Sequence, residues 1–442
     1  MEATRPLEAQ LNDFLPAKRL QALEGLLASG EAAGFSREAV NLHCHTFFSF
    51  NAYGYSPIGL AWLARQLGFK ALGIVDFDVL DGVNEFLNAC ELLGVRGSAG
   101  METRVFIPEF ASRDINSPGE PGVYYYMGIG FPASRPPASA AAILADMRRR
   151  AEERNRAMLA RINAFLAPVA VDYDRDVLPL TPAGNATERH MLVATQKAAA
   201  RRFPDPVNFW AEKLAMPPEQ VAAQIGDPVK FPNTLRAKLM KRGGVGYAQP
   251  GPDTFPSLEE VNRLIVACGA LPCATWLDGT SAGEQAEEEL LGLLISKGVV
   301  ALNIVPDRNW NLPDPEKRRA MVQMLYEVVA LCAKLDLPLN IGTEMNTYGN
   351  KLVDDFDAPE LAPVKQAFLD GAYFIYGHVR LQRSLGLGYQ SEWAKAHLPT
   401  RKARNAFYTA AGYRIAPGKA GQEQLIKLSS RLDPQALFAG LK

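Results

Sequence analysis

The chain has 442 residues, of which 48% are hydrophobic and 21% are charged, and its formal net charge is −1. This length is enough for one large domain with additions, or for two domains. The near-zero net charge gives no electrostatic reason to expect a nucleic acid or an anionic membrane as a partner.

The cysteines and the N-terminal segment favour a reducing compartment. The five cysteines are scattered, odd in number and without a Cys-x-x-Cys pair, which is typical of free thiols rather than of a disulfide framework. The opening segment MEATRPLEAQLNDF is acidic and polar, unlike a secretory signal peptide. No uncharged apolar run approaches the roughly 18 residues that a membrane span needs. We therefore expect a cytoplasmic protein.

Strands and helices are expected to alternate along the chain. Residues 5–38 are expected to be helical, and a helix at about 57–68 begins at Ser56-Pro57, an N-cap followed by a first-turn proline. A further helix is expected at 83–93. Strands are expected at 40–45, 71–76, 100–107, 123–131, 270–276, 298–305 and 337–343. Repeated strand–helix units predict a parallel sheet, either open or closed into a barrel.

Three regions lie outside this alternation. Residues 139–242 are rich in Ala and Arg and broken by prolines, which predicts a helical insertion, either a lid or a dimer surface, so a homo-oligomer stays an open alternative. Residues 358–442 are again expected to be helical, with a basic excess that is typical of a solvated face. The expected organisation is an N-terminal helical extension, two parts of an α/β unit around the insertion, and a C-terminal helical extension: 1–39, 40–138, 139–242, 243–357 and 358–442.

His43 and His45 are the most informative pair of residues. Side chains two apart on a strand share a face, so the two imidazoles converge, and neutral imidazole is a good ligand for a divalent metal. Two strand histidines without a metal are an equally good reading of this pair alone. Glu102 and Glu344 end other predicted strands, and the carboxyl ends of parallel strands converge on one site. Together the four residues predict a metal site.

Other polar residues are candidates for supporting roles. Asp76 ends the second strand, where it either orients the imidazoles or belongs to an aspartate turn that caps a helix. Arg104, Lys351 and Arg380 are candidates for binding a phosphate or carboxylate, the alternative being an ion pair or a surface position. His378 is expected after a strand as a general acid or base, or else as a structural histidine.

The order of motifs resembles the PHP superfamily, named for polymerase and histidinol phosphatase. The matching segments, within residues 40–355, are NLHCHTFFSF, ALGIVDFDVLDG, SAGMETRVF and LPLNIGTEMNTYGN. GNATERHMLVATQKAA, which contains His190, and GVGYAQPGPDTFPSLEEVNRLIVACGALPCATW resemble the branch that acts on nucleoside monophosphates and short oligonucleotides. The resemblance implies a distorted (β/α)7 barrel with a helical insertion and helical N- and C-terminal extensions, and a phosphoesterase activity.

The chain departs from the family at several ligand positions. Phe77 stands where the family has a histidine, Thr275 stands in place of the histidine of an Ala-His-Pro motif, and Asn346 replaces the histidine of the closing motif. Asn51 lies where a further histidine is common. Family members bind two or three metals, whereas the remaining set is expected to hold one divalent transition metal ion, and its donors do not choose among Zn, Mn and Fe.

Three functions follow as hypotheses. The first is a metal-dependent hydrolase of small phosphoesters such as a nucleotide or sugar phosphate, favoured by the order of motifs. Its metal is held by His43, His45, Glu102 and Glu344; its catalytic residues are Asp76, His190 and His378; and its substrate is bound by Arg104, Asn346, Lys351 and Arg380. The second is a one-metal lyase or isomerase acting on a sugar or sugar acid, favoured by the retained ligands and by neutral Asn346 and Thr275. The third is a non-catalytic PHP-like protein.

Overall fold

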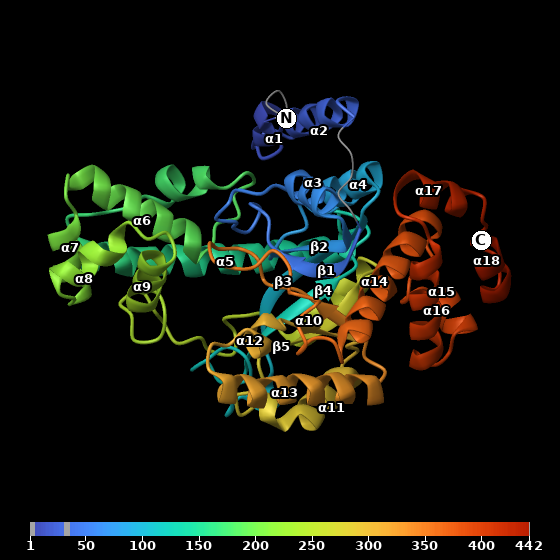
Figure 1. Cartoon of the computed structure of the whole chain (residues 1–442). Coiled ribbons are helices and arrows are strands. Elements are labelled where there is room, and N and C mark those ends of the chain that lie inside the picture. Colours follow the sequence, from blue (N-terminus) through green and yellow to red (C-terminus); the bar gives the residue numbers. More distant parts are fainter. Residues whose placement is uncertain (1–4, 31–35, 442) are drawn as a thin grey trace.

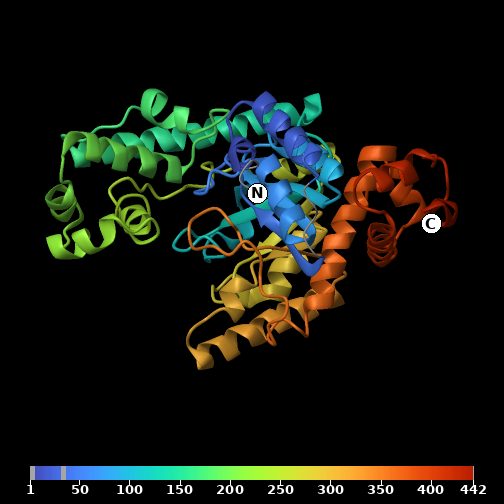
Figure 2. The same ribbon diagram turned by 45° about the horizontal axis from the view of Figure 1, so that its top comes forward.

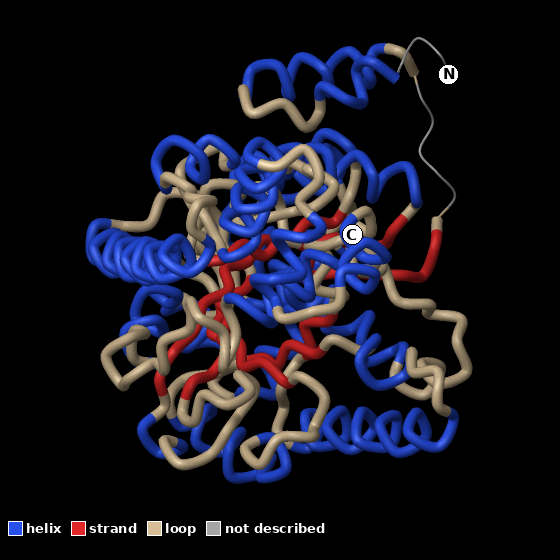
Figure 3. Tube along the Cα trace, turned by 90° about the vertical axis from the view of Figure 1, so that its left-hand side faces the viewer, coloured by secondary structure: helices blue, strands red, loops and turns tan. Residues whose placement is uncertain are grey.

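The computed structural model describes residues 5–30 and 36–441. Residues 1–4 and 31–35 of the predicted N-terminal extension therefore lie outside the described residues. In Figure 1 the strands occupy the centre, and helices surround them on all sides of the view. Figure 3 shows the same arrangement from the side, with the strands enclosed by helices and loops.

The sheet has seven strands whose order in space is their order in the chain. The strands are β1 (Arg37–Cys44), β2 (Phe69–Phe77), β3 (Arg96–Phe106), β4 (Val123–Ile129), β5 (Leu271–Trp276), β6 (Ala301–Ile304) and β7 (Leu339–Ile341). β4 is antiparallel to both neighbours, and the other neighbouring pairs are parallel. A parallel bridge between Cys44 and Met345 links the two ends of the sheet. The sheet is therefore a nearly closed, distorted barrel.

All seven strands lie where the sequence predicts them, and the helices of the α/β unit pack around them. These helices are α3 (Pro57–Leu67), α4 (Val83–Leu93), α10 (Leu258–Ala267), α11 (Glu287–Ser296), α12 (Asp307–Trp310) and α13 (Pro315–Lys334). The bounds of α3 follow from local chemistry. Ser56 accepts a hydrogen bond from the Gly59 N–H, Pro57 opens the helix, and Gly68 ends it with φ of 68°.

The predicted insertion is helical and has its own apolar cluster. Its helices are α5 (Ala138–Leu166), α6 (Glu188–Arg202), α7 (Val207–Leu214), α8 (Pro218–Ile225) and α9 (Lys230–Leu239). Trp210, Phe231 and Ile162 are buried in a cluster separate from the main core. Ile162 lies on α5, whereas Leu144, on the same helix, belongs to the main core. The helix α5 therefore joins two hydrophobic cores.

Helices also cover the remaining sides of the barrel. The N-terminal pair is α1 (Arg5–Gln10) and α2 (Pro16–Ala28), and the C-terminal group is α14 (Lys365–Leu385), α15 (Glu392–His397), α16 (Arg401–Arg414), α17 (Gly418–Ile426) and α18 (Pro434–Gly440). Figure 2 shows the C-terminal group and the insertion extending from opposite sides of the barrel. In the described part of the chain, no helix combines the length and apolar character needed to cross a membrane.

Candidate metal site and its cavity

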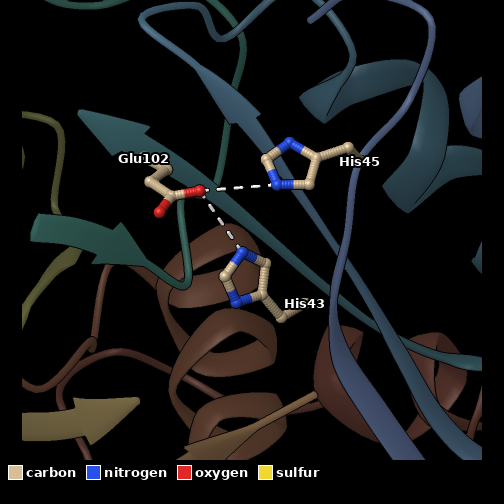
Figure 4. A group of neighbouring side chains, drawn as sticks. All are labelled: His43, His45 and Glu102. Atoms are coloured by element: carbon tan, nitrogen blue, oxygen red, sulfur yellow. Dashed lines mark hydrogen bonds and ion pairs between the residues drawn. The ribbon is translucent and has the colours of Figure 1, made fainter. Parts of the chain in front are cut away.

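His43 and His45, at the carboxyl end of β1, meet Glu102 of β3, which pairs with Phe77 at the end of β2. Glu102 Oε2 lies 3.4 Å from His43 Nε2 and 3.4 Å from His45 Nε2. Figure 4 marks both contacts with dashed lines. One potential ligand atom from each residue lies within 4.8 Å of the others, and all three residues are buried. We call these three residues the triad. The structure thus brings together three of the four predicted metal ligands.

A buried hydroxyl determines which nitrogen of His45 faces the triad. Ser49 Oγ donates its proton to Asp76 Oδ1 at 2.6 Å, so toward His45 Nδ1, 3.1 Å away, it acts as an acceptor. His45 therefore carries a proton on Nδ1, and the lone pair of the neutral ring is on Nε2. Asp76 is itself held by the N–H and hydroxyl of Thr46. The predicted role of Asp76 in orienting an imidazole matches this geometry, and Asp76 contacts His45 only through Ser49.

The donor set of the triad fits a divalent ion. His45 Nε2 is buried and makes no hydrogen bond within the described part of the chain. Burial raises the pKa of Glu102, but its contacts with the rings of His43 and His45 outweigh this and lower it. Burial lowers the pKa of His45, but Glu102 and other carboxylates outweigh this and raise it. A carboxylate and two imidazoles packed this closely are the ligands that zinc, manganese and iron accept.

Phe77 and Thr275, which the sequence resemblance sets against histidines, are engaged in contacts with protein groups. The ring of Phe77 stacks on His45 with centroids 4.9 Å apart. The Thr275 hydroxyl donates to the Tyr125 carbonyl and accepts from Asn116 Nδ2 at 2.7 Å. Both residues line the cavity described below, but neither supplies a nitrogen ligand. These two positions therefore add no imidazole to the triad.

Glu344, the fourth predicted ligand, lies outside the triad. Its Oε2 accepts a hydrogen bond from Arg308 Nη2 at 2.6 Å. Burial lowers the pKa of Arg308, but the charges of Glu344, Asp278 and Glu102 outweigh it and raise this pKa. Glu344 has a left-handed backbone with φ of 54°. Its role as a metal ligand stays a prediction, because the carboxylate pairs with a guanidinium in this structure.

The triad and the Arg308–Glu344 pair line one cavity of about 1000 Å³ between the barrel and the insertion. Five lining residues are acidic and eight are basic. The basic residues are Arg104, Arg154, Arg161, Arg189, Arg236, Lys241, Arg242 and Arg308. Arg104 and Asn346, both predicted to bind substrate, are among the lining residues. The cavity is thus electropositive around a small cluster of potential metal ligands, which favours an anionic ligand.

Two arginines of the insertion line this cavity without forming an ion pair among the described residues. Arg154 donates to the Thr254 carbonyl and Arg189 donates to Asn233 Oδ1, and among the described residues neither has an ion pair within 4 Å. Burial lowers the pKa of both side chains to about 10, so both are still cationic at neutral pH. An anion in the cavity would relieve the cost of burying these charges.

Two predicted site residues lie on α14, outside the residues that line the cavity. The prediction that His378 follows a strand was wrong, because it lies within this helix. Its Nδ1 accepts from the Tyr389 N–H at 3.0 Å, and its Nε2 donates to the Gly130 carbonyl at 3.2 Å. Arg380 is buried and pairs with Glu91 at 2.6 Å. Both ring nitrogens of His378 and the Nη1 of Arg380 thus bind protein groups, and position gives no support to the predicted roles of these residues in catalysis and substrate binding.

His190 and Lys351 also have partners within the protein. His190 Nδ1 accepts from the Thr187 N–H at 3.1 Å and caps α6, and burial lowers the pKa of His190 to about 4. Lys351 pairs with Asp307 at 3.1 Å and lies 4.0 Å from the ring centroid of Trp310. Neither side chain lines the cavity. The predicted catalytic role of His190 and the predicted substrate role of Lys351 therefore lack support from position.

Sequence reasoning missed the basic residues of the insertion and Arg308. Their spacing has no strand period, and the segments that carry them are far apart in the chain. The only available signal was the arginine content of residues 139–242, which predicted a helical insertion but not the side that faces the barrel.

Comparisons with known proteins bear on the fold. No protein-family model and no curated protein matches the chain. A similar solved structure is an amidohydrolase from Chromobacterium violaceum with bound sulfate and no metal, at 17% identity and a TM-score of 0.50, covering 75% of this chain and 96% of that one. Another comes from Bifidobacterium adolescentis, a protein provisionally assigned as a metal-dependent phosphoesterase, at 19% identity and a TM-score of 0.45, covering 74% and 96%. The first of these likenesses shows that the distorted barrel is a fold shared with a known protein.

Proposed function

We propose that this protein is a metal-dependent hydrolase of small phosphoesters, of the PHP type, with one divalent ion held by His43, His45 and Glu102. The observation that carries the proposal is the position of this triad in an electropositive cavity. A volume of about 1000 Å³ suits a small molecule such as a nucleotide or sugar phosphate. The similar structure from Chromobacterium violaceum is an amidohydrolase, which is also a hydrolase.

Different residues of the chain would orient the metal ligands and bind the substrate in such a reaction. A bound divalent ion polarises a phosphoryl oxygen and lowers the pKa of a water ligand, which is the chemistry that hydrolysis requires. Ser49 and Asp76 keep His45 in the tautomer that presents Nε2. Arg154 and Arg189 supply fixed positive charge to an anionic substrate, and the insertion that carries them covers one side of the cavity.

Elemental analysis and a phosphatase screen test the proposal together. Protein purified without chelator is expected to hold about one equivalent of a transition metal, and His45→Ala is expected to lose it. Wild-type protein with added Mn²⁺ is expected to release phosphate from some members of a panel of nucleotide and sugar phosphates. His397→Ala, which changes an exposed histidine of α15, is the matched control. A protein without metal or phosphate release would contradict the proposal, and a carbonyl product without phosphate would favour the lyase or isomerase.

A further inference from the structure

Arg308 is a cation held beside the triad by a single carboxylate. It lies on α12, directly after β6, and lines the same cavity as His43, His45 and Glu102. Its Nη2 donates to Glu344 Oε2 at 2.6 Å, and the two side chains are 38% and 30% exposed. The ion pair is therefore accessible from the cavity, where a small ligand can reach it.

The backbone around Glu344 is fixed on the strand that carries the histidines. The Met345 N–H donates to the His43 carbonyl, and the His45 N–H donates to the Met345 carbonyl at 3.1 Å. A Cβ at Gly342 would clash with the backbone nitrogen and Cβ of His43, so the segment before Glu344 lies directly against β1. The freedom left to Glu344 is rotation of its side chain.

Both members of this pair have a second kind of partner available. A guanidinium has five N–H donors in a planar fork, and it binds phosphate as well as carboxylate in a bidentate manner. In the structure Glu344 engages one nitrogen of this fork, Nη2. The Glu344 carboxylate is in turn a good ligand for a divalent ion. The pair can therefore exchange partners when an ion and an oxyanion enter the cavity.

We propose that Arg308 is the oxyanion-binding residue of this site, and that Glu344 pairs with Arg308 until a metal ion is bound. When Glu344 turns to the ion, Arg308 is released and pairs with the anionic group of the substrate. This inference rests on the proposed function for the ion and for the phosphoryl group. It makes ion binding and anion binding mutually reinforcing, because each ligand takes one member of the pair.

The test measures the affinity of the full-length, chelator-treated protein for inorganic phosphate by calorimetry. Glu344→Gln removes the competing carboxylate, so it is expected to bind phosphate about tenfold more tightly than the wild type. Arg308→Gln is expected to weaken phosphate binding, and the double variant is expected to lose the gain of Glu344→Gln. Arg308→Lys keeps the charge without the fork and is expected to be intermediate; it also serves if Arg308→Gln does not fold.

Arg318 and Glu360 provide a matched control pair. They lie 3.6 Å apart and are 38% and 29% exposed, close to the values of Arg308 and Glu344, and they do not line the cavity. Arg318→Gln and Glu360→Gln are expected to leave phosphate affinity unchanged. With Mn²⁺ added, the gain in phosphate affinity is expected to be larger in the wild type than in Glu344→Gln, whose Arg308 is already released.

The possible outcomes separate this inference from the proposed function. Equal phosphate affinity of the wild type and Arg308→Gln would overturn the role of Arg308, whether or not a metal is bound. No gain in Glu344→Gln would overturn the role of Glu344 in holding Arg308. A preference of the wild type for acetate over phosphate, or an absence of bound metal in the purified protein, would count against the proposed function, while the comparison of metal-free variants would still decide the role of Arg308.

Discussion

At the scale of single residues, the tautomer of His45 depends on one hydroxyl. Ser49 accepts from His45 Nδ1 because its own proton is committed to Asp76. Without this acceptor, the neutral imidazole is free to carry its proton on Nε2, where it blocks an ion. The Asp76 carboxylate orients His45 through this contact, and its charge also raises the pKa of His45.

We therefore expect Ser49→Ala to lower the metal affinity of the protein at least about tenfold. The affinity is measured by competition with a chromophoric chelator. Ser296→Ala is the control, since Ser296 is an exposed residue whose hydroxyl donates to the Leu293 carbonyl. An unchanged affinity in Ser49→Ala would show that the tautomer of His45 is determined by other contacts.

The triad could be predicted from the sequence, but the surrounding charges could not. The two-residue spacing of His43 and His45 on a strand, and the position of Glu102 at another strand end, require only strand geometry and convergence. Arg308 was missed because the role of an arginine depends on the group it pairs with, and its partner Glu344 is distant from it in sequence. His378 was misplaced for a different reason, which concerns the helix α14 that contains it.

At the scale of elements, α14 lies within the region 358–442 that the sequence predicts to be helical, and the structure shows a helix there. The segment around Tyr373–Val379 is rich in aromatic and β-branched residues, and nearly every side chain of it is buried. A helix buried on all sides has no polar face, so its sequence lacks the 3.6-residue period that identifies a surface helix. The expectation that His378 follows a strand did not agree with the helical prediction for this region, and His378 lies in the interior of the helix.

The burial of His378 predicts a loss of stability in acid. Burial lowers its pKa to about 4, below the unfolded value of about 6.5. The unfolded chain therefore binds a proton in this range that the folded protein does not, and stability decreases as pH falls from 6.5 to 4. We expect this residue alone to cost about 2 kcal/mol of unfolding free energy between pH 7 and 5.

Urea denaturation of His378→Gln at pH 7 and pH 5 tests this expectation. The variant is expected to be less stable than the wild type at pH 7 but to lose less stability on acidification, since glutamine stays neutral. His397→Gln, at an exposed position, is expected to lose as much as the wild type. Parallel losses in all three proteins would refute a neutral, buried His378.

At the scale of the whole molecule, the strands were predictable and their directions were not. The alternating pattern located seven strands, but it predicted a parallel sheet. β4 is antiparallel because residues 107–122, which join it to β3, contain only the short 3₁₀ helix Pro108–Phe110. A parallel crossover normally needs a helix of several turns between the strands. Strand patterns do not contain this information; the length and content of the connections do.

The two hydrophobic clusters predict that the insertion opens separately from the barrel. Phe231 is 1% exposed in the insertion cluster, so Phe231→Ala is expected to cost about 3–5 kcal/mol. In this variant we expect amide hydrogen exchange to be faster within residues 159–240 and unchanged in the barrel strands, as measured by mass spectrometry. Ile426→Ala, at a side chain that is 79% exposed, is the control. Equally faster exchange in the barrel would indicate a single cooperative unit.

The order of the strands has a consequence for how the site is assembled during synthesis. His43, His45 and Glu102 belong to β1 and β3, or directly follow β1, so they leave the ribosome together and early. Arg308 and Glu344 leave late, and Glu344 reaches its place only when Met345 pairs with β1 and closes the ring. A nascent chain can thus gather its ion ligands well before it can hold an oxyanion. The nascent chain is therefore expected to bind substrate only after the last strand is in place.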